Sequence, residues 1–262
     1  MIIETGNFYI FEMPPYFFFA GIGFAASVCC YILLLLFSDT NISKKNLVLC
    51  LITGVGILVG ARVFGCLTNI AIKIYSNEKI DFSVIYMAGL VFYGGLIGGV
   101  CFYLIGLRIL YKNQNNLNMI NAFAVSIPLF HMFGRIGCLF AGCCYGKEFH
   151  GHFHIDYLRD GVLTQNFPVQ AFESILELSI FLFLLIMFIK NLKQADQNKN
   201  NLLLHYFFIY SIGRFVLEFF RGDPNRGYFG ILSFSQIVSI VLFTFAIFMF
   251  VKNKYGVNNE NH

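Results

Sequence analysis

Long apolar runs separated by short polar stretches dominate the chain. Several runs exceed about 18 residues, enough to cross roughly 30 Å of hydrocarbon as a helix. The pattern predicts about seven transmembrane helices, near Tyr16–Phe37, Asn46–Ile72, Val84–Tyr111, Leu117–Phe140, Val169–Ile189, Leu202–Phe220 and Leu232–Val251. We therefore expect an all-α, polytopic membrane protein that folds as a single integral membrane domain over residues 1–262.

Nine of the 18 basic residues follow every second apolar run. They lie after the first, third, fifth and seventh runs, at Lys44, Lys45, Arg108, Lys112, Lys190, Lys193, Lys199, Lys252 and Lys254. The positive-inside rule places these loops in the cytoplasm, which predicts an N-out, C-in topology with an extracytoplasmic loop at about 141–168. The acidic, proline-containing start does not resemble a signal peptide, so we expect the first run to remain as a helix. Polar residues at about 256–262 predict a mobile C-terminal tail.

Composition and charge agree with a membrane protein. Hydrophobic residues make up 58% of the 262 residues and charged residues 12%, whereas soluble domains carry about twice that charged share. The formal net charge of +4 is spread over the loops. Nothing in this distribution implies a nucleic-acid partner.

A few charged side chains lie inside the apolar runs, where each costs roughly 2.5 to 3.5 kcal/mol on insertion scales. They are Arg62, Arg135, Glu173, Glu177, Arg214 and Glu218. Arg214 and Glu218 are four residues apart, so they can pair on one helix face. Each arginine could simply pair with a glutamate to hold the helices together. Several buried guanidinium groups near one leaflet, however, fit a phosphate-bearing ligand that enters from the bilayer.

A glycine-rich stretch, FYGGLIGGV, carries Gly94, Gly95, Gly98 and Gly99. This small-xxx-small spacing is typical of close helix packing, and it would equally let a lipid approach the backbone. Tyr93 stands beside these glycines, where a buried hydroxyl needs a hydrogen-bond partner.

Three cysteines gather at the outward end of the fourth predicted helix, at Cys138, Cys143 and Cys144, whereas the other five lie in apolar helices and suggest core packing. The sequence leaves open whether two of these cysteines form a disulfide or all three are free thiols. The nearby His150, His152 and His154 could add metal ligands, but no paired CxxC or HxxxH motif occurs and a solvated hairpin is the simpler interpretation.

Five stretches resemble bacterial prolipoprotein diacylglyceryl transferases in the family's order. They are GAR at 60–62, YGGLIGG at 93–99, GRIG with a later glycine at 134–146, FPVQAFESILE at 167–177, and GRFVLEFFRGDPNRG at 213–227. The resemblance covers most of the chain.

The resemblance implies transfer of the diacylglyceryl group from phosphatidylglycerol to the lipobox cysteine of a preprolipoprotein, with release of glycerol phosphate. It also implies a bacterial cytoplasmic membrane location, with the active site toward the outer leaflet. Neither a metal nor an organic cofactor is implied, because lipid and peptide carry all the reacting atoms.

Site residues follow from the matched positions. Arg135 and Arg214 would hold the headgroup phosphate, Glu218 would orient Arg214, and the glycines Gly94, Gly95, Gly98 and Gly99 would admit the lipid. Supporting substrate contacts are expected from Arg62, Gly146, Gln170, Glu173 and Arg221.

The chain departs from the family pattern at three positions. Tyr93 stands where a histidine is usual, Cys138 where an asparagine is usual, and Cys143 where an acidic residue is common. Tyr93 as the catalytic base is a hypothesis, since a phenol is a poorer base than imidazole at neutral pH.

Three alternatives remain open. The first is a paralogue with a different acceptor. The second is a membrane thiol-redox or metal-handling protein that uses Cys138, Cys143 and Cys144 on the same scaffold. The third is a transporter, although no inverted repeat is visible.

Overall fold

A computed structural model describes most of the chain. It covers residues 2–4, 10, 12–40, 42–75, 79–86, 89–112, 116–159, 161–194, 200–223, 228–229 and 231–259. Across these residues the chain forms eight helices and five short strands. Contacts divide it into two compact units, with residues 1–39, 117–226 and 235–262 in the first and residues 40–116 and 227–234 in the second.

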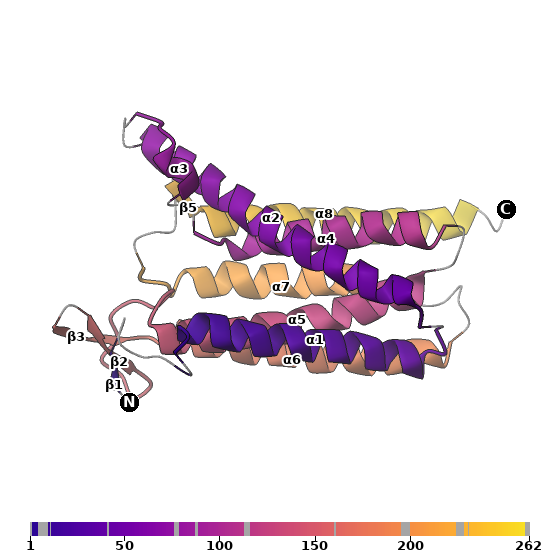
Figure 1. The fold of residues 1–262 in the computed structure, drawn as a ribbon, viewed down its shortest axis with the longest axis horizontal. Coiled ribbons are helices and arrows are strands. Elements are labelled where there is room, and N and C mark those ends of the chain that lie inside the picture. Colours follow the sequence, from indigo (N-terminus) through magenta and orange to yellow (C-terminus); the bar gives the residue numbers. More distant parts are fainter. Residues whose placement is uncertain are drawn as a thin grey trace. The chain divides into compact units, whose positions relative to one another are not determined.

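The first unit is a helical bundle. Its helices are α1 (Pro15–Phe37), α5 (Leu117–Ala141), α6 (Val169–Leu192), α7 (Leu202–Glu218) and, apart from its first residue, α8 (Phe234–Asn259). Within it α5 is central, because it packs against α1, α6 and α7 (Figure 1). The predicted polar tail overlaps the end of α8, and residues 260–262 lie outside the described residues.

A small sheet lies at one end of this bundle (Figure 1). Its strands β1 (Ile2–Glu4), β2 (Ile155–Arg159) and β3 (Val162–Asn166) are ordered β1-β2-β3, with β1 parallel and β3 antiparallel to β2. The β2–β3 hairpin falls inside the segment predicted as an extracytoplasmic loop. It starts at Ile155, after the three histidines, and residues 151–153 form a bend.

The second unit contains α2 (Lys44–Tyr75), the one-turn α3 (Ser83–Tyr86), α4 (Phe92–Leu110) and a hairpin of β4 (Tyr228–Phe229) and β5 (Leu232–Ser233). A single helix predicted from Val84 to Tyr111 is therefore wrong. Val91 has extended backbone, with φ −94° and ψ 122°, and its N–H donates to the carbonyl of Ala61 at 3.2 Å. That bond to α2 sets where α4 begins.

Glycines bring α2 and α4 into backbone contact. A Cβ added at Gly60 would lie 2.2 Å from the carbonyl oxygen of Gly94, and one at Gly98 would lie 2.2 Å from that of Gly56. Neither position tolerates a side chain unless the helices separate. The helix-packing interpretation of the glycine run is thus confirmed.

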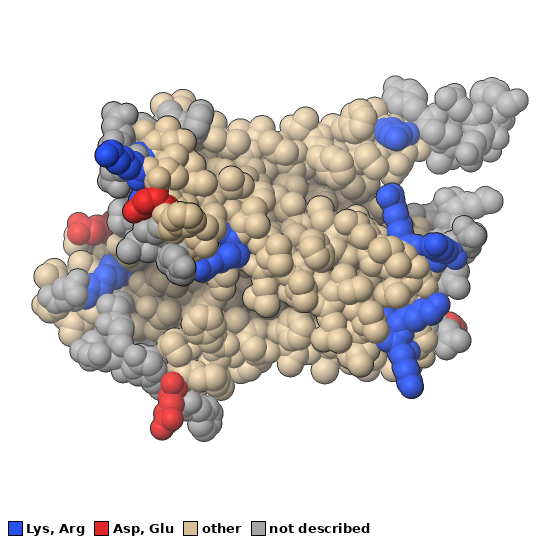
Figure 2. Space-filling view, turned by 45° about the horizontal axis from the view of Figure 1, so that its top comes forward, with Lys and Arg blue, Asp and Glu red and all other residues tan. Residues whose placement is uncertain are grey.

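Six helices are long and apolar enough to cross a membrane, namely α1, α2, α4, α5, α6 and α8. The predicted sixth span corresponds to α7, which has 17 residues and is about 26 Å long. Large apolar side chains such as Phe37, Leu47 and Ile109 are exposed on the helices. On the face that Figure 2 shows, the charged side chains gather toward the two ends, and the middle is uncharged. The chain is an all-α, multi-pass membrane protein.

Candidate active site

One glutamate joins two arginines from separate helices of the first unit. Glu173 on α6 forms an ion pair through Oε1 with Arg214 on α7, and its Oε2 lies 2.9 Å from Nε of Arg135 on α5. All three residues are at least 94% buried. The structure therefore confirms that Arg135 and Arg214 converge.

The end of α7 extends this network. Arg214 pairs with Glu218 at 2.7 Å one turn later, as the four-residue spacing predicts. Arg221 lies 3.7 Å from the same Glu218 carboxylate and also binds Asp223 through two bonds, of 2.8 and 2.6 Å. A bidentate pair of this kind fixes the plane of the guanidinium group.

Backbone contacts hold Arg221 in place. It forms an isolated β-bridge with Gly146, and Gly222 donates to the carbonyl of Tyr145 at 2.9 Å. A Cβ at Gly146 would lie 2.2 Å from the carbonyl oxygen of Phe167. Gly146 therefore matters because the chain passes too close there for any side chain.

A second buried pair lies on the same helices, between His131 of α5 and Glu177 of α6, with Nδ1 and Oε1 2.7 Å apart. Arg135 donates through Nε to Nε2 of His131 at 3.1 Å. Because Nε2 accepts this bond, the proton of a neutral imidazole sits on Nδ1 and faces Glu177. We did not predict His131, although its position four residues before Arg135 in an apolar run could have indicated it.

Gln170, also predicted as a site residue, supports the loop after α5. Its Nε2 donates to the carbonyl of Cys143 at 2.7 Å and to the hydroxyl of Tyr157 at 3.2 Å. Tyr157 in turn donates to the carbonyl of Leu139. Burial raises the pKa of Tyr157 to about 12, so its hydroxyl remains a donor at neutral pH.

The arginine network retains capacity for a ligand. Among the described residues, Nε of Arg214 is a buried side-chain donor that lacks a hydrogen-bond partner. A guanidinium group has five N–H donors in a fork that matches two phosphate oxygens. The arrangement can therefore bind a phosphate ester in a water-poor site.

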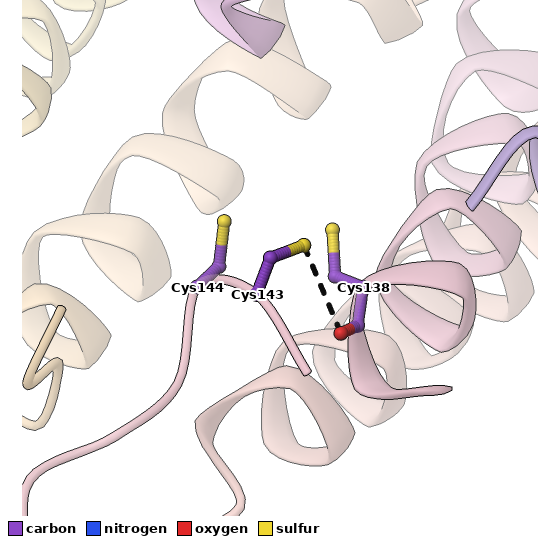
Figure 3. Close-up of side chains that lie close together, drawn as sticks. All are labelled: Cys138, Cys143 and Cys144. Atoms are coloured by element: carbon purple, nitrogen blue, oxygen red, sulfur yellow. Dashed lines mark hydrogen bonds between the residues drawn. The ribbon is translucent and has the colours of Figure 1, made fainter. Parts of the chain in front are cut away.

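The three clustered cysteines lie at the end of α5, which holds Cys138, and in the loop after it, which holds Cys143 and Cys144 (Figure 3). Hydrogen bonds with the thiols of Cys138 and Cys143 lower the pKa of Cys144 well below its usual value, and the guanidinium groups of Arg221 and Arg135 lower it further. A bond to Cys138 lowers the pKa of Cys143, but a bond to Cys144 and burial outweigh it and raise this pKa to about 12. Cys144 is therefore a stronger acid than Cys143.

Two cysteines differ from the expectation of core packing, and two histidines make local hydrogen bonds. All eight cysteines are free, and Cys29 and Cys101 are exposed on their helices, so core packing is the wrong expectation for these two. His150 and His154 bond to Gln165 and to the carbonyl of Gly151.

The remaining predicted residues belong to the second unit. Arg62 is exposed, contrary to the expectation of burial, because its guanidinium reaches out to donate to the carbonyl of Ile85 at 2.7 Å. Tyr93 is buried at the start of α4. Gly95 and Gly99 face Ile57 of α2. The roles of these residues in substrate binding stay predictions.

Comparison with known proteins identifies the family. A sequence model described as prolipoprotein diacylglyceryl transferase matches residues 8–252. Phosphatidylglycerol–prolipoprotein diacylglyceryl transferase 2 of Clostridium perfringens is 32% identical, over 99% of this chain and 98% of its own length. The phosphatidylglycerol–prolipoprotein diacylglyceryl transferase of Campylobacter hominis is 30% identical over 76% of this chain and 71% of its own. The chain therefore belongs to the prolipoprotein diacylglyceryl transferase family.

Proposed function

We propose that this protein transfers the diacylglyceryl group of phosphatidylglycerol to the thiol of the lipobox cysteine in a preprolipoprotein, releasing glycerol phosphate. Family membership and the printed names of the relatives support the lipid and protein substrates. The reaction is a substitution at carbon, so the protein must favour a thiolate and stabilise a departing phosphate.

The bridge from Arg135 through Glu173 to Arg214 carries the proposal. Two guanidinium groups held by one carboxylate present donors from two helices to a single anion. In the buried site their charges are poorly screened, so they stabilise the negative charge that grows on the leaving phosphate. Arg135 and Arg214 contact the phosphate, and Glu218 orients Arg214.

The other predicted residues take supporting roles in this proposal. Gln170, Glu173, Arg221 and Gly146 hold the arginines and the adjoining loop. In the second unit, Arg62 is a supporting substrate contact and Tyr93 is the candidate base for the thiol proton, whereas the glycines of α4 serve the packing against α2.

Charge along the first unit supports an orientation. Lys190 lies near the end of α6, whereas Glu173 of the arginine network lies in its first turns. The successive helices α6, α7 and α8 run in alternating directions. Lys252 near the end of α8 therefore lies at the same end of the bundle as Lys190. By the positive-inside rule these lysines face the cytoplasm. The active site then faces the outer leaflet of a bacterial cytoplasmic membrane.

A transfer assay tests the proposal. Full-length protein in phosphatidylglycerol nanodiscs should convert a lipobox peptide into a peptide carrying diacylglyceryl as a thioether, detected by mass spectrometry. Arg135→Ala should lower the rate by at least about 100-fold, because one preorganised donor is lost. Arg108→Ala, at an exposed position on α4, is the matched control and should retain the rate. A wild-type protein inert with every phospholipid offered would refute the proposal.

A further inference from the structure

The three thiols at the end of α5 and in the loop after it form a compact donor set that phosphate binding does not use. The Sγ atoms of Cys138, Cys143 and Cys144 all lie within 4.8 Å of one another, and Figure 3 shows them gathered between the end of α5 and the following loop. Left-handed backbone at Gly142, with φ 66°, and at Cys144, with φ 55°, turns the loop so that these thiols meet. Residues other than glycine rarely adopt this backbone conformation, and those that do cluster at functional sites.

The spacing suits a thiophilic metal ion. Zn–S bonds of about 2.3 Å place the sulfurs of a tetrahedral site about 3.8 Å apart, so small side-chain shifts would close the set around an ion. Among the residues that the structure describes, no fourth histidine, cysteine or carboxylate joins the group. Cys143 is exposed, which gives an ion a way in. Three protein ligands and one open position are typical of reactive rather than structural zinc sites.

The surroundings also support an ion with thiolate ligands. The guanidinium groups of Arg135 and Arg221 act electrostatically on Cys144 and offset the negative charge that three thiolates bring. Gln170, fully buried on α6, holds the carbonyl of Cys143 at 2.7 Å. In metal sites, hydrogen bonds of this kind to the ligating residues fix the positions of the ligands.

We propose that Cys138, Cys143 and Cys144 bind one thiophilic metal ion of the zinc type, and that the open coordination position receives the sulfur of the acceptor cysteine. The second half rests on the proposed function. On binding, the acceptor thiol releases its proton to solvent, because a metal-bound thiol is deprotonated, so this step does not need Tyr93 as the base. Its sulfur then forms the bond to the glycerol carbon of the lipid while the carbon–oxygen bond to phosphate breaks. The neutral thioether is a weaker ligand and departs.

Metal binding is tested first, without lipid turnover. Reduced full-length protein in nanodiscs, stripped with a chelator and dialysed against Zn²⁺, should retain one zinc per chain. Cys143→Ser should lower zinc affinity more than about tenfold. Loss of a group that only hydrogen-bonds to a metal ligand already lowers affinity about 10- to 100-fold. The control variant Cys101→Ser, which removes an exposed thiol on α4, should bind zinc like the wild type. Equal zinc affinity in Cys143→Ser, or no uptake by the wild type, would overturn the site.

The acceptor role is tested with Co²⁺ in place of zinc. A lipobox peptide should intensify the sulfur-to-cobalt absorption, and the same peptide with serine for cysteine should not. No change with the cysteine peptide would overturn this role. Full transfer by metal-free protein would overturn it too and leave the proposed function standing. Metal and peptide binding without any transfer would support the inference and refute the proposed function instead.

Discussion

The α2–α4 contact and the α5–α6–α7 contact hold helices together in opposite ways. Between α2 and α4, glycines let the two backbones touch, and the contact needs no charge. Between α5, α6 and α7, the buried Arg135, Glu173 and Arg214 form the link. Replacing a buried ion network by apolar residues is often neutral or stabilising, so stability alone does not explain why charges are placed there. On the proposed function, the first contact builds the scaffold and the second serves the phosphate of the lipid.

The largest effect should follow from Glu173→Ala, which leaves two buried guanidinium groups without their shared carboxylate. Loss of one partner from a buried ion pair costs about 3–5 kcal/mol. We expect a large drop in thermal stability in detergent, and loss of transfer. Glu173→Gln is the matched variant, because it keeps the volume and one acceptor oxygen and should fold better than the alanine variant. Equal stability of Glu173→Ala and the wild type would show that the pairs do not form.

A smaller effect is expected from Gly60→Ala in the other contact. Its Cβ would meet the carbonyl of Gly94 at 2.2 Å, and overpacking costs typically about 1–3 kcal/mol. The thermal midpoint should fall. Gly21→Ala in α1, where a Cβ meets nothing within 4 Å, should leave it unchanged or raise it slightly. If both variants behave alike, the α2–α4 backbone contact is not as close as described.

The smallest effect should come from Tyr157→Phe, which removes the hydroxyl that donates to Leu139 and accepts from Gln170. A single hydrogen bond contributes about 0.5–1.5 kcal/mol. Thermal unfolding should detect a slight loss, and the rate of transfer should change far less than in Arg135→Ala. A loss of transfer as large as in that variant would place Tyr157 in the phosphate site itself.

Local patterns predicted much of the fold and part of the site. The helices followed from apolar run length, and the Arg214–Glu218 pair followed from helical spacing. Glu173 as the link to Arg214 could not be predicted, because the two residues are 41 positions apart and meet only once α6 packs against α7. The break before α4 depends likewise on a backbone bond to α2.

The cysteine group shows the same limit. Proximity in sequence indicated that Cys138, Cys143 and Cys144 could meet. Left-handed backbone at Cys144 brings the three sulfurs together. A cysteine does not indicate this conformation in the way that a glycine would. Sequence therefore identified the donors, and only the loop conformation showed their common orientation.

Lipid binding by full-length protein in nanodiscs tests most directly whether the linked arginines recognise phosphate. Native mass spectrometry would compare phosphatidylglycerol with diacylglycerol of the same chains. Arg214→Ala should weaken phosphatidylglycerol binding at least about tenfold, because charge-assisted bonds contribute about 1.5–3 kcal/mol each, and it should leave diacylglycerol binding unchanged. An equal loss for both lipids, or no loss for either, would contradict the account.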